Sequence, residues 1–335
     1  MKILLTEPLI EPVDSQGIKI MEEVGEVKLA SEPSEDCLIR EARDVDALVV
    51  RLANVSSKVI ENAKRLKVIA RTGVGVDNID VKSATEKGIM VVNLPVMNTD
   101  SVAEHAICLT LALAKNLTVF DKEVRKGNWA ARDQLLERNI EIKGKTLGIV
   151  GLGAIGVAVA HRAKALNMRV IYYSRRRKIE VEERLEIEYL DLNTLLAQSD
   201  FITVHVALTK ETRHLFGQRE FRLMKERAYF VNTSRGSVVD QEALFGALEK
   251  GWIAGAALDV FEEEPPAQSF AGLGLRNLIL TPHVAGFTKD ARERMIITLA
   301  RDVVEVLRGG LPKNLVNKEV LDKRNNVEIN YDQNT

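Results

Sequence analysis

Residues 146–166 read TLGIVGLGAIGVAVAHRAKAL. An apolar run typical of a buried strand ends at Gly151, and a segment with helical apolar periodicity begins just after Gly153. In this setting Gly151 permits a tight turn, Gly153 lets the backbone approach a pyrophosphate, and Gly156 lets strand and helix pack closely. The N–H groups at the start of such a helix favour phosphate. We predict a dinucleotide site, against the alternative of a glycine-rich turn without a ligand; its expected contacts here are Gly151, Gly153, Ala154, Ile155 and Gly156.

The next strand pattern ends in a basic cluster. Ser174 is followed by Arg175, Arg176 and Arg177, and the first acidic residue after the strand is Glu180. A dinucleotide site that takes NAD commonly has a carboxylate at this place, which holds the ribose hydroxyls. Guanidinium groups bind a 2′-phosphate instead. The pattern therefore predicts NAD(P)(H) with NADP(H) favoured; in the alternative, one arginine stacks on the adenine and NAD is accepted.

Short β-branched runs alternate with amphipathic segments on both sides of residue 100, which predicts an α/β protein with two doubly wound parallel sheets. Ser101 and Glu104 have the spacing of a capping box for a buried helix from about Val102 to Lys115. A further helix from Thr288 lets the chain return to the first domain. We expect a discontinuous substrate domain, 1–99 and 288–335, and a nucleotide-binding domain, 100–287; the tail after Val320 is polar and aperiodic.

The overall composition excludes several classes of protein. The 335 residues include 47 Lys and Arg against 48 Asp and Glu, so no general positive field draws the chain to nucleic acid or membranes. The first residues, MKILLTEP, are typical of a strand and not of a signal peptide, and we expect a cytoplasmic protein. Cys37 and Cys108 lie far apart among apolar residues, which predicts two buried thiols and no metal site.

Ionisable residues follow three strand patterns of the second domain, where ligands of open α/β sheets bind. Arg235 follows NTS, three glutamates precede Pro265, and His283 stands between Pro282 and VAG. Taken alone, such an arginine or glutamate is more often a solvated surface residue. Together they supply a cation for a carboxylate and an imidazole that can move a proton near neutrality. The remaining predicted cofactor contacts are Val102, Ser174, Arg175, Arg176, His205, Ala207, Thr212, Thr233, Ser234 and Asp259.

The order of these motifs resembles the D-isomer-specific 2-hydroxyacid dehydrogenases from about Leu48 to Leu321. The motifs are RTGVGVDNIDV, NTDSVAEHA, GLGAIG, NTSRG, LDVFEEEP and TPHVAG. The resemblance implies a Rossmann nucleotide-binding domain inserted in a flavodoxin-like substrate domain, and a homodimer. It also implies that Arg235 binds the substrate carboxylate, that Glu264 pairs with His283, and that His283 is the general acid and base. A family of dinucleotide-sensing corepressors has the same fold and triad, and is the alternative of another class.

The choice of 2-hydroxy acid depends on loops of the first domain. Val74 and Gly75 belong to a loop whose N–H groups are suited to a carboxylate, and the family uses this segment in that way. Arg51 ends a strand pattern and is suited to a second anion, or is only a surface arginine. Together with His283 and Arg235, these are the predicted substrate contacts. VVR with RTGVGVDN resembles the 3-phosphoglycerate dehydrogenases, the favoured reading, whereas YYSRRRK and IEYLDLNTLL resemble glyoxylate and hydroxypyruvate reductases.

Overall fold

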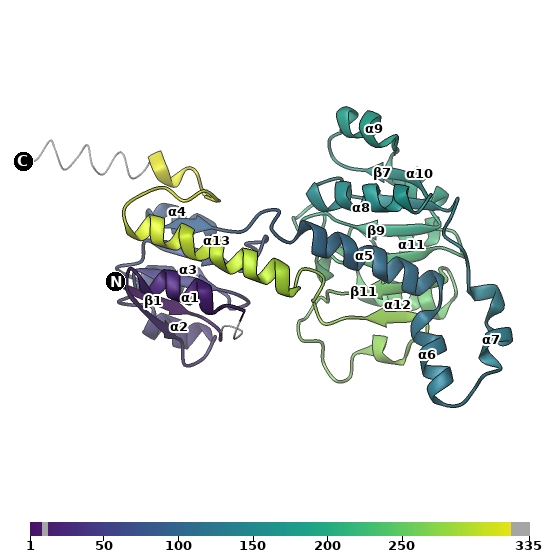
Figure 1. The fold of residues 1–335 in the computed structure, drawn as a ribbon, viewed down its shortest axis with the longest axis horizontal. Coiled ribbons are helices and arrows are strands. Elements are labelled where there is room, and N and C mark those ends of the chain that lie inside the picture. Colours follow the sequence, from purple (N-terminus) through teal and green to yellow (C-terminus); the bar gives the residue numbers. More distant parts are fainter. Residues whose placement is uncertain (9–12, 323–335) are drawn as a thin grey trace, which may run out of the picture. The chain divides into compact units, whose positions relative to one another are not determined.

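The computed structural model describes residues 1–8 and 13–322, and it contains two compact units (Figure 1). Unit 1 comprises Met1–Asn98 and Lys289–Thr335, and unit 2 comprises Thr99–Thr288. The polar tail expected after Val320 falls, from position 323 onward, outside the described residues.

Unit 1 is a five-stranded parallel sheet with helices on both faces. Its strands are β1 (Lys2–Leu5), β2 (Glu26–Leu29), β3 (Ala47–Val50), β4 (Val68–Arg71) and β5 (Met90–Val92). Its helices are α1 (Ser15–Glu22), α2 (Glu35–Glu41), α3 (Ser57–Asn62), α4 (Val81–Glu86) and α13 (Lys289–Leu307). Apolar side chains of α1 and α13 cover one face, and those of α2, α3 and α4 cover the other.

The strand order of unit 1 is β2-β1-β3-β4-β5. This is the flavodoxin-like order, and its topological switch point lies between β1 and β3, where ligands of such sheets bind. The chain returns to unit 1 through α13, which packs beside α1 (Figure 1). Strand β3 is buried at all four positions, which explains why it reads as the uninterrupted apolar run ALVV.

Unit 2 is a seven-stranded parallel sheet. Its strands are β6 (Thr146–Val150), β7 (Arg169–Tyr173), β8 (Glu188–Tyr189), β9 (Phe201–Val204), β10 (Tyr229–Asn232), β11 (Gly255–Leu258) and β12 (Leu278–Leu280). Its α-helices are α5 (Thr99–Ala114), α6 (Leu117–Arg125), α7 (Ala131–Gln134), α8 (Ala154–Ala165), α9 (Ile179–Leu185), α10 (Leu192–Gln198), α11 (Gln218–Leu223) and α12 (Gln241–Glu249). Short 3₁₀ turns span Leu136–Arg138, Gly236–Val238 and Ala271–Gly274.

The strand order of unit 2 is β12-β11-β10-β9-β6-β7-β8, with all pairs parallel. Read from β8, this is the Rossmann order with one more strand at the far edge, and the switch point lies between β6 and β9. Helices α5 and α8 pack on one face, and α10, α11 and α12 pack on the other. The prediction of two doubly wound parallel sheets is confirmed.

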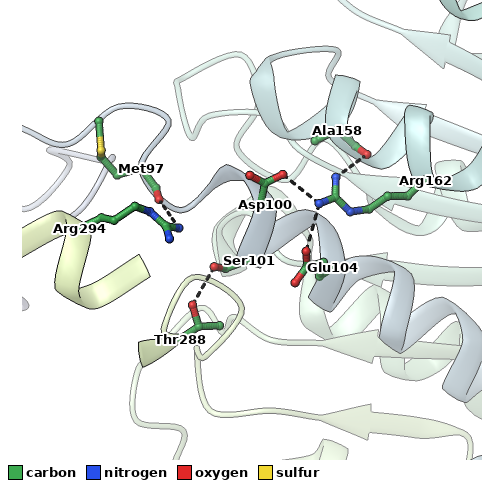
Figure 2. A network of polar contacts seen from close by, with 8 residues as sticks. All are labelled: Met97, Asp100, Ser101, Glu104, Ala158, Arg162, Thr288 and Arg294. Atoms are coloured by element: carbon green, nitrogen blue, oxygen red, sulfur yellow. Dashed lines mark hydrogen bonds and ion pairs between the residues drawn. The ribbon is translucent and has the colours of Figure 1, made fainter. Parts of the chain in front are cut away.

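The start of α5 differs from the prediction. The helix begins at Thr99, so Ser101 lies inside its first turn and is not a cap. Figure 2 shows the reason: the Ser101 hydroxyl lies 2.8 Å from Thr288 Oγ1, and Glu104 accepts a hydrogen bond of 3.1 Å from Arg162. Arg162 also donates to Asp100 at 2.9 Å. Both side chains of the expected capping box thus form tertiary contacts and do not cap the helix.

The prediction for the two cysteines was half right. Cys37 is buried, but Cys108 is exposed, because it lies on the side of α5 opposite the buried residues Ala106 and Leu113. No single helix of the described residues is long and apolar enough to cross a membrane. Helices α5 and α6 satisfy that test only as a pair, and the chain bends by 60° between them.

Candidate active site

The loop between β6 and α8 has the backbone that the glycine motif requires. Gly151 has φ +103°, in the left-handed region, and a Cβ there would lie 2.6 Å from the His205 carbonyl oxygen. A Cβ on Gly156 would lie 2.2 Å from the Gly151 carbonyl oxygen. At Gly153 a Cβ would meet nothing within 4 Å, and Gly153 and Ala154 are exposed. The turn is therefore tight at its base and open at the start of α8, the form that admits a pyrophosphate.

Two buried polar atoms beside this loop fit a polar ligand. His205 Nδ1 follows β9 and Thr233 Oγ1 follows β10, and neither has a hydrogen-bond partner in the part of the chain that the structure describes. Buried polar groups are normally satisfied, so these two atoms suit the polar groups of a dinucleotide. His205 Nε2 lies 2.9 Å from Thr203 Oγ1. Burial lowers the pKa of His205 to about 3, which makes its ring neutral at physiological pH.

The basic loop after β7 contains one arginine that is already engaged. Arg177 donates to both carboxylate oxygens of Glu182, at 2.9 and 2.8 Å, and the Tyr172 hydroxyl donates to the same carboxylate at 2.5 Å. The hydrogen bond from Arg177 lowers the pKa of Glu182. Arg175 and Arg176 are exposed, and the Ser174 hydroxyl donates to the Arg176 carbonyl at 2.6 Å. The three guanidinium groups expected for a 2′-phosphate are therefore reduced to two.

The other predicted cofactor contacts lie around the same sheet. The Thr212 hydroxyl donates to the Ala207 carbonyl at 2.6 Å and closes the loop that follows β9. Val102 is buried in the first turn of α5, and Ile155 is half-buried in the first turn of α8. The Ser234 hydroxyl donates to Asn232 Oδ1 at 2.8 Å.

His283 and Glu264 form a pair in unit 2. His283 Nδ1 lies 2.6 Å from Glu264 Oε2, and Glu264 Oε1 accepts from the Phe261 N–H at 3.0 Å. An ionised carboxylate only accepts hydrogen bonds, so Nδ1 carries a proton and Nε2 is the nitrogen that can exchange one. Burial raises the pKa of Glu264, but the His283 hydrogen bond, the Phe261 N–H and the nearby charges of His283 and Arg235 outweigh it, and its pKa is lowered.

The turn that holds Arg235 is organised by the buried side chain of Asn232, at the end of β10. Asn232 Nδ2 donates to the Arg235 carbonyl at 3.0 Å, and Asn232 Oδ1 accepts from the Ser234 N–H at 3.0 Å. Arg235 Nη1 donates to the Ser234 carbonyl at 2.8 Å. The structure thus brings Arg235, Glu264 and His283 to neighbouring strand ends of one sheet.

The predicted substrate contacts of unit 1 follow two adjacent strands, β3 and β4. Glu7 accepts hydrogen bonds from three consecutive N–H groups, those of Arg51 at 3.0 Å, Leu52 at 2.7 Å and Ala53 at 2.6 Å. Val74 is exposed, and its carbonyl accepts from Asn93 Nδ2 at 2.6 Å. The carboxylate of Glu7 therefore lies directly against the backbone of Arg51.

The NAD binding domain model of the D-isomer specific 2-hydroxyacid dehydrogenases matches residues 107–285. A glyoxylate reductase of Thermococcus litoralis is 46% identical over 328 residues, which cover 96% of this chain and 98% of that protein. The chain belongs to this family. It is an NAD(P)-dependent oxidoreductase that acts on the CH–OH group of a small 2-hydroxy acid, or on the matching 2-oxo acid.

Two further relatives of this dehydrogenase bear different names. A D-3-phosphoglycerate dehydrogenase of Methanocaldococcus jannaschii is 46% identical over 318 residues, which cover 94% of this chain but 59% of that protein. The solved structure of a glyoxylate reductase from Paecilomyes thermophila has a TM-score of 0.84 at 29% identity and covers 95% of this chain and 99% of that chain. The described residues contain no group of three or more His, Cys, Asp and Glu that could hold a metal ion.

Some contacts of the site were not visible in the sequence. Glu7 reads only as an acidic residue after a strand, and its amide partners lie 44 or more positions away. In the sequence Glu182 is one of several glutamates of a surface helix, although in the structure its carboxylate accepts hydrogen bonds from Arg177. Asn232 did offer a signal, since it stands at the end of an apolar strand directly before Thr233, Ser234 and Arg235.

Proposed function

We propose that this dehydrogenase reduces glyoxylate or hydroxypyruvate to the corresponding 2-hydroxy acid, with NADPH as the preferred cofactor. The observation that carries the proposal is the pair of His283 and Glu264 at 2.6 Å, at strand ends neighbouring that of Arg235. An imidazole held by a carboxylate beside a guanidinium group is a suitable set for protonating the carbonyl of an anionic 2-oxo acid.

Each side chain has one part in the reaction. Arg235 binds the carboxylate of the substrate by two parallel hydrogen bonds and orients its carbonyl group. Glu264 holds the proton on His283 Nδ1, so that His283 Nε2 gives its proton to the carbonyl oxygen, or takes one from the hydroxyl in the reverse direction. The loop Gly151–Gly156 would hold the dinucleotide, whose nicotinamide would supply or accept the hydride at C2.

The choice of substrate departs from the reading favoured by the sequence. Arg51 and the Val74–Gly75 loop favoured 3-phosphoglycerate, and the relative from Methanocaldococcus jannaschii carries that name. The near full-length relative from Thermococcus litoralis is named for glyoxylate instead. Glu7 supports the same choice, because a carboxylate against the backbone of Arg51 repels a phosphate there. The contacts of Arg51, Val74 and Gly75 with substrate stay predictions.

The preference for NADPH is supported by the loop after β7. Arg175 and Arg176 are exposed there, and the Glu182 carboxylate is occupied by Arg177 and Tyr172. Two exposed guanidinium groups, beside a Glu182 carboxylate that is already engaged, favour a ligand with a 2′-phosphate. Substitution of Ser174 by Asp should raise the KM for NADPH selectively; equal effects on NADPH and NADH would contradict this part of the proposal.

A homodimer in the cytoplasm completes the proposal. The segment 117–136 exposes four large apolar side chains, and no residue of α6 is buried within the unit. Such a surface suits an interface with a second copy of the chain. These side chains are Leu117, Val124, Trp129 and Leu136. Sedimentation velocity should give twice the 37.3 kDa of one chain, and Trp129→Glu with Val124→Glu should shift it to the monomer.

The experiment that tests the activity is a steady-state panel of purified protein. The 2-oxo acids glyoxylate, hydroxypyruvate, 3-phosphohydroxypyruvate and pyruvate are each measured with NADPH and with NADH. The proposal expects the highest kcat/KM for glyoxylate or hydroxypyruvate with NADPH. A higher kcat/KM for 3-phosphohydroxypyruvate would replace it by the 3-phosphoglycerate assignment, and no turnover of any acid would overturn both.

A further inference from the structure

A network of hydrogen bonds that ends on a buried aspartate lies next to the loop of His283, entirely within unit 2. Asp259 follows β11 and is fully buried. Its Oδ1 accepts a hydrogen bond of 2.5 Å from the Thr281 hydroxyl. His105, which comes from α5, places Nε2 3.1 Å from Thr281 Oγ1 and 3.6 Å from Asp259 Oδ1. The chain His105–Thr281–Asp259 joins three segments that are far apart in the sequence.

The same aspartate holds the backbone on both sides of the imidazole. The N–H of His283 donates to the Asp259 carbonyl at 2.8 Å. The N–H of Val284 donates to Oδ1 at 2.9 Å, and that of Ala285 donates to Oδ2 at 2.8 Å. Three consecutive amides are thus attached to one residue.

These bonds coincide with a strained backbone. His283 has φ +52°, in the left-handed region that residues with a side chain seldom occupy. Such a conformation is disfavoured and persists only where the surroundings hold it. The three amide bonds to Asp259 supply that restraint, and each is of ordinary length.

The hydrogen bonds also give the chain a direction. The carboxylate oxygens of Asp259 can only accept hydrogen bonds. The single proton of the Thr281 hydroxyl is therefore donated to Oδ1. Towards His105 the Thr281 oxygen must then accept, which places a proton on His105 Nε2. His105 therefore donates a hydrogen bond to Thr281, and Thr281 donates one to Asp259, the residue that holds the His283 loop.

We propose that Thr281 and His105 are positioning residues for the reaction: through Asp259 they hold His283 in its left-handed conformation and so place the proton of Nε2 at the substrate. This inference rests on the proposed function, because it takes His283 as the acid and base. It assigns a role to His105, which by sequence is only a polar residue of an apolar helix. A purely structural network would stabilise the end of β12 without affecting the chemistry.

Two pairs of variants separate these roles. Thr281→Val keeps the shape of the side chain but removes the hydroxyl, whereas Thr281→Ser keeps the hydroxyl. His105→Leu removes the donor, whereas His105→Gln keeps one. Thr110→Val is the matched control: Thr110 is buried on the same helix as His105, and its hydroxyl donates to the Ala106 carbonyl at 2.8 Å.

The expected result is a split between turnover and binding. Thr281→Val and His105→Leu should lower kcat for glyoxylate about tenfold to a hundredfold, since a small displacement of a catalytic group has effects of that size. The Kd for NADPH, measured by fluorescence, should change less than about threefold. Thr281→Ser, His105→Gln and Thr110→Val should keep kcat within about threefold. Equal kcat losses in Thr281→Val and Thr281→Ser would overturn the role of the hydroxyl.

Amide hydrogen exchange of a peptide containing residues 283–285 supplies a readout that does not depend on activity. Thr281→Val should speed exchange there about tenfold or more, and Thr281→Ser should leave it unchanged. Unchanged exchange in Thr281→Val would overturn the restraint, and faster exchange with unchanged kcat would overturn its part in the reaction. If His283→Ala kept its turnover, the proposed function would fail instead, whatever the exchange rates were.

Discussion

The two switch points of the molecule are built differently. In unit 2 the loop after β6 meets the loop after β9 through Gly151, whose missing side chain lets the backbones approach. In unit 1 the loop after β1 meets the loop after β3 through Glu7, whose carboxylate occupies the N–H groups of three residues. The switch point of unit 2 thus has an open anion-binding loop, whereas the amides at the switch point of unit 1 are already bound by the protein's own carboxylate.

This difference explains why only one of the two sheets is expected to bind the phosphates of the cofactor. Open α/β sheets bind ligands at the switch point, so the fold alone would allow a phosphate site in either unit. The glycine loop after β6 leaves the N–H groups at the start of α8 accessible. After β1, the Glu7 carboxylate already accepts hydrogen bonds from the amides of residues 51–53. We infer that the cofactor is bound by unit 2.

The largest expected effect concerns the chemistry assigned to unit 2. His283→Ala should lower kcat for glyoxylate about 10²- to 10⁴-fold, because it removes the group that transfers the proton. The Kd for NADPH should stay within about threefold, since the glycine loop is untouched. His161→Ala, in α8, is the control and should retain turnover. A variant at 283 with wild-type kcat would contradict the assignment of acid and base.

The next effect closes the open loop. Gly151→Val adds a Cβ 2.6 Å from the His205 carbonyl and forces a branched residue to φ +103°. We expect the Kd for NADPH to rise about tenfold to a hundredfold, since the left-handed conformation alone costs about 1 to 2 kcal/mol. Gly246→Val, in α12, where a Cβ meets nothing within 4 Å, is the control. Cofactor titration by fluorescence measures both; equal affinities would mean that the loop is not the binding element.

A third effect concerns the pH dependence of the free energy of unfolding through His205, which lies beside Gly151 and has a neutral ring. The pKa of His205 is lowered to about 3 by burial, whereas an unfolded histidine has a pKa of about 6.5. Above pH 6.5 both states are neutral; as the pH falls towards 3, the unfolded state binds the proton first. The free energy of unfolding should therefore fall by about 1.4 kcal/mol per pH unit between these limits through this group.

His205→Gln removes that titration and keeps a polar group towards Thr203. Urea unfolding at pH 7 and at pH 5 measures the difference between the variant and the wild type. The wild type should lose more stability than the variant over this interval. Parallel losses in the two proteins would show that His205 is protonated in the folded state.

The smallest expected effect concerns the filled loop of unit 1. Glu7→Gln removes one negative charge beside the backbone of Arg51 while keeping an acceptor for the amides. The ratio of kcat/KM for glyoxylate to that for 3-phosphohydroxypyruvate should fall about fivefold, the size of one exposed charge interaction. Glu61→Gln, in α3, is the control. An unchanged ratio would remove Glu7 from the account of specificity.

The sequence predicted the fold and the local motifs well, because these depend on neighbouring residues. The glycine pattern at 151–156 needs only its own strand and helix, and the apolar runs of a parallel sheet are continuous. The pairing of His283 with Glu264 was implied by the family resemblance, and His283 Nδ1 lies 2.6 Å from Glu264 Oε2 in the structure.

Contacts between distant segments were not predictable in this way. The capping box at Ser101 was overridden by Thr288 and Arg162, which are 187 and 58 positions from their partners. His105 meets Thr281 across 176 positions, and no periodicity reports such a pairing. Cys108 was expected to be buried because its neighbours are apolar, but its position around the helix decides its exposure.

Amide hydrogen exchange with and without NADPH tests the contrast between the two switch points most directly. We predict slower exchange on binding at residues 151–156 and 174–176, and no change at Arg51, Leu52 and Ala53, whose N–H groups Glu7 already holds. Slower exchange at residues 51–53 without protection of 151–156 would contradict the account.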